Sequence, residues 1–281
     1  MNASFTARRE ISAKLTTFFV CFVSILIFTR TKAQVNDTLA KLVQNKVANL
    51  LQLPFQNNMD VGIGPQQRMR NTLNIQPVIP FKLGRTLNVI TRVIVPVIFQ
   101  PDISKEKIGY FGLGDINPSF FFSPAHPGNV IWGVGPSFLL PTATLPELGT
   151  GKWSAGPGFI FLIQPGNLTL GAYTVNVFSF AGDKKREEIN LMNFNPYFAY
   201  TLPKKFYLTS SPIITVNWNA DKGNKTLLPL GFGIGKIALI DKQYMNFSIQ
   251  YYVYIVKSRQ LNGPDGQLRL QWTLLFPYRK K

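Results

Sequence analysis

The sequence predicts an all-β fold: an antiparallel transmembrane β-barrel of about twelve strands with a short N-terminal amphipathic helix. Three observations predict it: period-two alternation of apolar and polar residues, alternately short and long connections, and an unusual composition. Of the 281 residues, 46% are hydrophobic, 13% aromatic and only 15% charged, which excludes an intrinsically disordered chain. After residue 30 no apolar run reaches the roughly 18 residues that a helical membrane span requires.

The first 33 residues have the three parts of a secretory signal peptide. A basic start precedes an apolar stretch from residue 18 to 28, and Ala33 supplies the small residue of a cleavage site. A signal anchor or a buried N-terminal helix is the alternative, but the stretch is short for a membrane span. The single cysteine, Cys21, leaves with the signal, so the mature chain has no thiol chemistry. Removal of five basic residues and one acid lowers the net charge from +17 to +13.

Residues 34–57 form a separate segment before the first predicted strand. Apolar residues recur at helical spacing from Val35 to Leu53, with lysine and glutamine opposite them, and Asn36 or Asp37 can cap the helix. We expect this helix to plug the barrel mouth, to lie on the periplasmic membrane surface, or to close one end of the barrel. The barrel itself is expected over residues 58–281.

The alternation is clearest in the last segment. Its even-numbered residues from 268 to 276 are apolar, and its odd-numbered residues from 267 to 273 are polar. Successive strand side chains point to opposite faces, so one face is apolar and the other is polar. The whole chain gives twelve such segments, near residues 58–65, 71–82, 86–100, 108–122, 129–141, 152–164, 168–180, 188–201, 206–219, 226–240, 243–257 and 266–276.

Proline is the main complication, because it removes a ladder donor and is confined to edges, strand ends and bulges. We therefore expect several bulges, at the prolines inside the segments: Pro77, Pro96, Pro118, Pro136, Pro157, Pro196, Pro212 and Pro229. Two segments, 86–100 and 226–240, are apolar on both faces in places, which leaves their phase open.

The connections alternate in length. Those after even-numbered strands are short, as at 83–85 and 241–242, whereas those after odd-numbered strands are mostly longer and more charged, as at 142–151 and 181–187. Transmembrane barrels have short periplasmic turns and longer outer loops. A soluble sandwich or lipocalin-like barrel also alternates, but with its apolar residues inside. Long strands with an aromatic-rich apolar face favour the membrane barrel.

Several short strings, spread over most of residues 40–276, resemble one family. They are Pro54-Phe55-Gln56-Asn57-Asn58, Gly62-Ile63-Gly64-Pro65, Leu73-Asn74-Ile75-Gln76-Pro77-Val78-Ile79-Pro80, Gly112-Leu113-Gly114-Asp115, Phe120-Phe121-Phe122-Ser123-Pro124, Trp132-Gly133-Val134-Gly135-Pro136, Leu140-Pro141-Thr142-Ala143-Thr144, Leu148-Gly149-Thr150-Gly151-Lys152-Trp153 and Ser179-Phe180-Ala181-Gly182-Asp183. Together they resemble the bacterial outer-membrane β-barrel family associated with meta-pathway phenol degradation, which also carries generic transporter and neuromedin-U names. The resemblance implies an outer-membrane barrel that passes small apolar or aromatic molecules. The chain departs from many such barrels by continuing for five residues after Phe276.

Candidate lumen residues share one property: they lie out of phase with the apolar stripe. They are Asn74, Gln76, Arg92, Asp115, Asn117, Asn176, Asn193, Asn195, Tyr197, Asn217, Gln250 and Arg269, together with Asp60 and Gln271. Amides with few charges suit a hydrogen-bonded, partly filled interior, and tyrosines such as Tyr252 and Tyr254 offer stacking surfaces to an aromatic solute. Alternate glycines, as in 231–235, leave room on one face for a large side chain, a ligand or the helix.

No catalytic or metal site is predicted. The only histidine, His126, lies in a predicted turn, and neither Ser123 nor Ser137 has the spacing to it that an outer-membrane phospholipase requires. One histidine and no mature cysteine do not suggest a metal site, and the glycines of 231–235 precede no helix that could bind a phosphate. We expect neither an enzyme nor a cofactor.

The sequence thus predicts an outer-membrane channel or transporter of a Gram-negative bacterium, which passes small apolar or aromatic solutes passively through its lumen. A closed structural or interaction barrel is one alternative, and a lipid-modifying enzyme of the outer membrane is another. The expected partners are the lipid bilayer and outer-membrane lipids, the outer-membrane assembly machinery and a small solute. Nucleic acid is excluded, because the basic residues form no binding motif.

Overall fold

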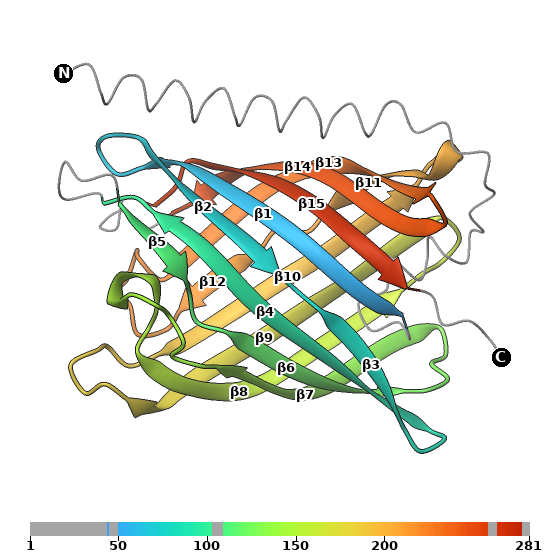
Figure 1. The fold of residues 1–281 in the computed structure, drawn as a ribbon, viewed down its shortest axis with the longest axis horizontal. Coiled ribbons are helices and arrows are strands. Elements are labelled where there is room, and N and C mark those ends of the chain that lie inside the picture. The colour runs from blue at the N-terminus through green and yellow to red at the C-terminus, as the bar shows by residue number, and fades with distance from the viewer. Residues whose placement is uncertain (1–43, 45–49, 103–108, 258–262, 277–281) are drawn as a thin grey trace.

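The computed structural model describes residues 44, 50–102, 109–257 and 263–276, which form a closed antiparallel β-barrel (Figure 1). The predicted signal peptide and nearly all of the predicted N-terminal helix lie outside these residues. The described strands are β1 Leu51–Ile63, β2 Arg68–Ile75, β3 Val78–Leu83, β4 Leu87–Gln100, β5 Tyr110–Leu113, β6 Asn117–Pro124, β7 Val130–Leu139, β8 Lys152–Ile163, β9 Leu168–Gly182, β10 Asn190–Thr201, β11 Phe206–Ser210, β12 Ile214–Asn217, β13 Thr226–Ile240, β14 Gln243–Val256 and β15 Gly266–Phe276.

These segments make a barrel wall of twelve strands, as the sequence predicts. Three wall strands are each interrupted once, so that β2 continues as β3, β5 as β6, and β11 as β12. Each wall strand pairs with the next along the chain, and β1 pairs with β15 to close the cylinder, with Leu51 opposite Phe276 and Val61 opposite Gly266. The all-β, twelve-stranded antiparallel barrel is therefore confirmed.

The first strand begins earlier than predicted. It starts at Leu51, whereas the sequence analysis placed residues 34–57 in the N-terminal segment and extended its helix to Leu53. Period two already holds from Leu51 onward, because Gln52 and Gln56 alternate with Leu53 and Phe55 and join the polar inner face. The apolar residues with helical spacing continue up to Leu53, so the sequence analysis did not detect that the strand alternation begins at Leu51.

The prolines produce fewer bulges than predicted. Pro77 and Pro212 lie where the ladder is interrupted, and proline has no N–H to donate to it, yet the register on either side of each is the same. Pro229 does lie at a shift of register, opposite Tyr254. Another extra residue lies between Leu113 and Asn117, where β5 passes into β6.

The apolar face of the barrel points outward. On β15, Trp272 is 37% exposed, whereas its neighbour Thr273, which points inward, is 1% exposed. Exposed aromatic side chains gather near both ends of the strands. Those near the long-loop end are Phe111, Trp153, Phe178, Phe180 and Trp218, and those near the short-turn end are Phe81, Trp132, Phe161, Tyr200 and Phe276. Such paired girdles are typical of transmembrane barrels.

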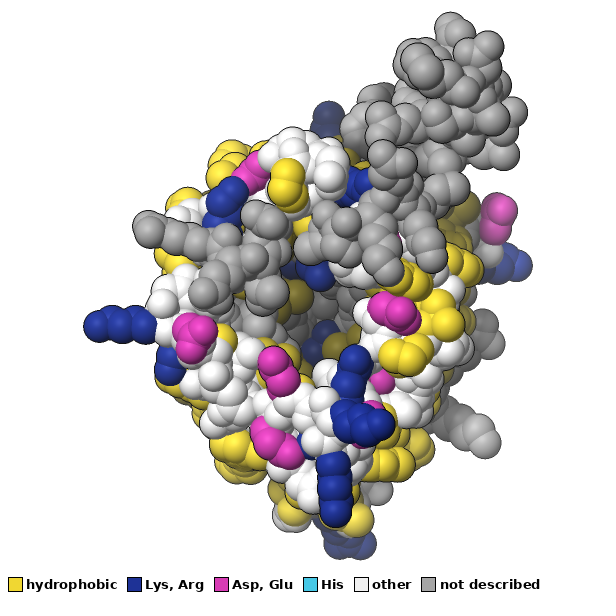
Figure 2. Space-filling model, turned by 90° about the vertical axis from the view of Figure 1, so that its left-hand side faces the viewer, with side chains coloured by type: hydrophobic (Ala, Val, Ile, Leu, Met, Phe, Trp, Pro, Cys, Tyr) yellow, Lys and Arg dark blue, Asp and Glu magenta, His cyan; other side chains and the backbone are white. Residues whose placement is uncertain are grey.

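The connections have the predicted asymmetry. The ends of the cylinder carry short turns on one side, such as 84–86 and 241–242, and mostly longer loops on the other, such as 140–151 and 183–189 (Figure 1). Seen from the long-loop end, charged side chains surround a central hollow and hydrophobic ones lie at the outer edge (Figure 2). Within the part of the chain that the structure describes, no helix is both long and apolar enough to cross a bilayer.

The inner face of β13, between β11 and β14, carries three glycines in alternate positions, Gly231, Gly233 and Gly235. We call these residues the glycine strip, because no side chain extends from them into the lumen. Side chains from the flanking strands meet across this strip. Tyr207 of β11 lies over Gly235 and donates its hydroxyl hydrogen to Asn246 Oδ1 of β14, at 2.7 Å. The predicted room for large side chains is thus occupied here by a tyrosine from the neighbouring strand.

Candidate solute-binding cavity in the barrel lumen

The lumen has an apolar wall and a polar wall. The apolar wall comes from β3, β4, β6, β8 and β9 and consists of Val78, Ile90, Phe121, Ile160, Tyr173 and Val175. Within it the Phe121 and Tyr173 rings meet edge to face, with centroids 5.7 Å apart. The polar wall, on β1, β11, β14 and β15, presents mainly amide and hydroxyl side chains.

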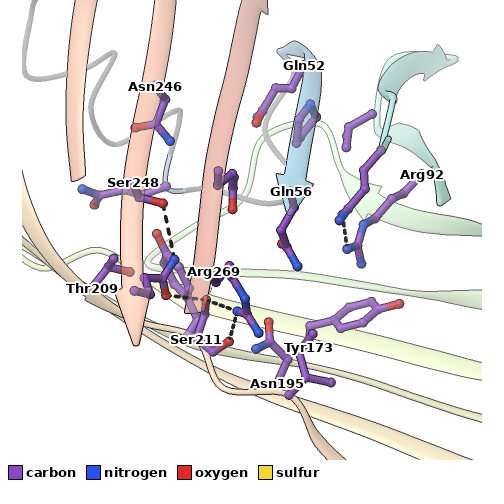
Figure 3. Close-up of a pocket in the computed structure, with 18 of the residues that line it drawn as sticks. Gln52, Gln56, Arg92, Tyr173, Asn195, Thr209, Ser211, Asn246, Ser248 and Arg269 are labelled. Carbon is purple, nitrogen blue, oxygen red and sulfur yellow. Dashed lines mark hydrogen bonds between the residues drawn. The ribbon is translucent and has the colours of Figure 1, made fainter. Parts of the chain in front are cut away.

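A cavity of about 130 Å³ lies between these walls (Figure 3). Its polar lining is Gln44, Gln52, Gln56, Gln76, Arg92, Asn195, Thr209, Ser211, Asn246, Ser248, Gln250, Arg269 and Gln271, and its apolar and aromatic lining adds Pro54, Tyr197, Tyr207 and Ile213 to the apolar wall. An apolar cavity of roughly 150 Å³ holds one benzene molecule, so the volume suits a solute with a single ring.

Arg269 is the more buried of the two described arginines that line the cavity, at 2% exposure. Its Nε donates to Asn58 Oδ1 at 3.0 Å, Nη1 to the Ser211 carbonyl at 2.7 Å, and Nη2 to Gln267 Oε1 at 2.9 Å. The guanidinium also lies 4.8 Å from the centre of the Tyr252 ring, within cation–π range. These contacts join β15 to β1, to β14 and to Ser211, which directly follows β11, so the Arg269 guanidinium is held on the polar wall.

Arg92 projects from β4 on the other side of the cavity. One of its Nη atoms donates to Gln76 Oε1 at 2.6 Å, and its guanidinium lies 5.1 Å from the centre of the Tyr173 ring. Figure 3 shows Arg92 and Arg269 directed into the same space. Because Tyr173 also contacts Phe121, the Arg92 cation lies at the edge of the apolar wall.

An ion pair lies on the long-loop side of the cavity. Asp60 is 3% exposed and accepts from Arg70 Nη2 at 2.7 Å, from Gln267 Nε2 at 2.7 Å and from the Tyr254 hydroxyl at 3.3 Å. Arg70 forms an ion pair with Asp60, so the charge of this acid is balanced by a residue of the neighbouring strand.

The loop 140–151 packs inside the long-loop end of the barrel. Its 3₁₀ turn, η1 Pro146–Leu148, lies against Gly112 and Gly114 on the same face as Ile98, which the strand register directs inward. Asp115 fastens the loop, because it accepts from the Thr150 amide at 2.6 Å and from the Ala143 amide at 3.2 Å.

Gln44 is the one described residue before Leu50, and its side chain lies in the lumen. It is a helical residue that is 3% exposed; its Oε1 accepts from Thr169 Oγ1 at 2.6 Å, and its Nε2 donates to Thr201 Oγ1 at 3.1 Å. Leu50 follows at the short-turn end and packs against Leu275 and Tyr244. The other residues of the predicted helix up to 49 lie outside the described part of the chain.

Half of the twelve predicted lumen residues line the cavity together: Gln76, Arg92, Asn195, Tyr197, Gln250 and Arg269. Gln271 lines it too. Four others bond elsewhere on the inner wall or at the mouth: Asp115 with the loop, Asn117 with Ser137, Asn193 with Thr215, and Asn217 with the Asn219 amide. Asn74 points inward opposite Gln56 but is not part of the cavity lining.

Asn176 does not face the lumen. Its strand neighbour Val175 belongs to the apolar wall, so Asn176 points outward, where its Oδ1 accepts from Trp218 Nε1 at 2.8 Å and its Nδ2 donates to Asn190. The prediction failed because β9 is apolar on both faces, which hides its phase. For the same reason the sequence analysis missed Tyr173, whereas the polar phase of β14 could have identified Asn246 and Ser248.

The described residues contain no arrangement of the phospholipase kind. His126 is exposed at the tip of the 125–129 turn, Ser123 points inward, and Ser137 bonds to Ser119 at 2.8 Å. No three His, Cys, Asp or Glu side chains gather in the described part of the chain as a metal site would require.

No family model and no curated protein sequence matches the chain. Its fold is similar to that of an outer membrane channel from Pseudomonas putida F1, with a TM-score of 0.59 and 11% identity over 81% of this chain and 94% of that one. Weaker similarities are to outer membrane phospholipase A from Escherichia coli (TM-score 0.43, 12% identity, 85% and 98% covered) and to a FadL homologue from Pseudomonas aeruginosa (0.41, 9%, 82% and 90%). Such low identity supports a shared barrel fold and nothing finer.

Proposed function

We propose that this protein is an outer-membrane channel of a Gram-negative bacterium that passes small apolar or aromatic solutes passively through its lumen. The observation that carries the proposal is a single-ring-sized cavity inside a barrel whose exterior is apolar. The similarity of fold to a bacterial outer membrane channel supports it, as does the resemblance to the phenol-degradation family.

The proposal includes the route to the membrane. The signal over residues 1–33 is cleaved, so the mature chain begins at Gln34, and the assembly machinery inserts the barrel with its long loops outside. Exposed lysines at the rims, such as Lys184 and Lys204, meet the phosphates of outer-membrane lipids. N-terminal sequencing of the protein from isolated outer membranes tests this route, and a chain that retains residues 1–33 contradicts it.

Flux through the lumen is tested with the refolded barrel in liposomes. We expect influx of a small aromatic solute such as benzyl alcohol or benzoate to exceed that of liposomes with a closed eight-stranded barrel. Ile160→Trp fills the cavity from the apolar wall and should abolish the excess, whereas Phe161→Trp, on the adjacent outward position, should leave it unchanged.

A closed structural barrel is the second candidate, because Gln44 occupies part of the lumen and loop 140–151 packs into its mouth. Flux of the wild-type barrel no greater than that of the closed control, with correct folding confirmed by its heat-dependent shift on gel electrophoresis, would establish this candidate in place of the channel.

A further inference from the structure

The cavity carries more positive than negative charge. Its described lining includes two arginines, Arg92 and Arg269, and neither Asp nor Glu. The nearby acid, Asp60, is bound by Arg70. Because Arg70 balances the charge of Asp60, Arg92 and Arg269 leave two positive charges on the described lining of the cavity. Charges that are partly buried interact more strongly than charges in bulk water.

Arg92 keeps hydrogen-bonding capacity for a ligand. An arginine has five N–H donors in a planar fork, and among the described residues only Gln76 accepts from Arg92. The Tyr173 ring covers one face of the guanidinium, so the donors at its edge point into the cavity.

Among the residues that the structure describes, no carboxylate contacts Arg269 either. Its described acceptors are the side chains of Asn58 and Gln267 and the carbonyl and hydroxyl of Ser211, which are all neutral. Burial of a cation is unfavourable unless an anion balances it. An anionic solute would supply that balance.

We propose that the cavity binds an aromatic carboxylate, with the carboxylate at Arg92 and within the field of Arg269 and the ring against Phe121 and Ile160. This specifies the solute class of the proposed channel and rests on the same cavity. Arginine binds carboxylates in bidentate geometry. The chain of contacts from Arg92 through Tyr173 to Phe121 places the cation and the apolar wall side by side, and the volume accommodates one ring.

Binding is tested by isothermal titration calorimetry of the full mature chain in detergent micelles at pH 7. Benzoate, neutral benzamide and cationic benzylamine have one ring each and differ in charge. We expect benzoate to bind at least about tenfold more tightly than benzamide, as a charge-assisted hydrogen bond implies, and benzylamine to bind least.

Arg92→Gln should weaken benzoate binding by about tenfold while leaving benzamide binding nearly unchanged, and Arg92→Lys should retain part of the preference. The control is Arg85→Gln, in the exposed turn before β4, which should bind benzoate as the wild type does. Equal affinity for benzoate and benzamide in the wild type, or an unchanged benzoate affinity in Arg92→Gln, overturns the proposal. If Arg92→Gln fails to fold, the proposal is still tested by the ratio of benzoate to benzamide affinity in the wild type and by the benzoate affinity of Arg92→Lys.

Flux and binding separate the two proposals. Tight benzoate binding without flux above the closed control refutes the channel and leaves the anion site standing. Flux of benzyl alcohol with no preference of the binding site for benzoate refutes the anion site alone.

Discussion

Glu188 lies in the loop between β9 and β10, and its carboxylate binds this loop to β8. Its Oε1 accepts from Lys152 Nζ at 2.6 Å, and its other oxygen accepts from the Ser179 hydroxyl. These hydrogen bonds, that from Lys152 first, lower the pKa of Glu188 below 4.5. Lys152 is buried on the inner wall whereas Glu188 is exposed, so the pair joins the lumen to a surface loop.

The pH dependence of stability follows from the direction of that shift. Because the folded-state pKa is lowered, the pair stabilises the fold above the unfolded-state pKa of 4.5, and the contribution is lost as pH falls through the folded-state value. We expect Glu188→Gln to lower the urea midpoint of unfolding at pH 7. At a pH below the folded-state pKa of Glu188, the variant and the wild type should have the same midpoint. A difference from the wild type that stays constant with pH would contradict the assignment. Glu187→Gln, on the neighbouring exposed residue, is the control.

At the residue scale, sequence phase predicted the lumen where one face of a strand is polar. Gln250 and Arg269 were found in this way, since β14 and β15 alternate cleanly. Phase gave the wrong face for Asn176, because the apolar wall makes β9 apolar on both sides. Where the lumen wall is apolar, alternation of apolar and polar residues cannot distinguish the inward side chains of a strand from its outward ones.

The glycine strip of β13 is the element on which the polar wall depends. A Cβ at Gly235 would overlap the Tyr207 ring, which crosses the strip to reach Asn246. Overpacking of this kind is typically unfavourable by about 1–3 kcal/mol.

Gly235→Ala should therefore destabilise the barrel by about 1–3 kcal/mol in equilibrium urea unfolding. Gly128→Ala is the matched control, because no atom lies within 4 Å of the added Cβ and its φ is not positive. A Gly235→Ala variant as stable as Gly128→Ala would show that Tyr207 does not occupy this space.

Loop 140–151 is a second element, and the Asp115 carboxylate is the only acid among the described residues that accepts from its backbone amides. Asp115→Ala removes both acceptors of the loop amides. We expect amide hydrogen exchange at Thr144 and Leu148, which are hydrogen-bonded in the folded loop, to accelerate by at least about tenfold, as the loss of a charge-assisted hydrogen bond implies.

The loop prediction has a control in Asp221→Ala, in the loop between β12 and β13, which should leave exchange at Thr144 and Leu148 unchanged. Unchanged exchange in Asp115→Ala would mean that packing of Leu148 and the contacts from Arg186 hold the loop without the carboxylate.

At the element scale, the sequence located all twelve wall strands, because alternation and turn residues act locally. It missed the first seven residues of β1, where helical spacing upstream runs into period two. It also assigned too many bulges to proline. A missing donor such as that of Pro77 leaves the register intact when the strands on both sides still pair, and this is a tertiary effect.

At the scale of the whole molecule, the outward apolar surface predicts how strongly a charged substitution on the outer face lowers the stability of the barrel. Phe159 lies near the middle of β8 and Phe180 near the long-loop end of β9, and both are exposed. In lipid, a lysine is unfavourable by about 2–4 kcal/mol at the bilayer midplane and by about 0–1 kcal/mol near the interface.

Phe159→Lys should thus be about 2–4 kcal/mol less stable than the wild type in lipid vesicles, and Phe180→Lys within about 1 kcal/mol of it. Equilibrium guanidinium unfolding in vesicles measures both. Similar effects of the two substitutions would argue against a bilayer around the middle of the strands.

The pairing of β1 with β15 has a consequence for folding kinetics. The barrel closes through contacts between residues more than two hundred positions apart, such as Leu51 and Phe276. Loop-closure entropy has to be overcome before these contacts form, so closure should be a slow step. Until the last strand has been synthesised and delivered, the free edge of the first is an aggregation hazard. The chain therefore depends on protection of its unfolded state from the moment its first strand emerges.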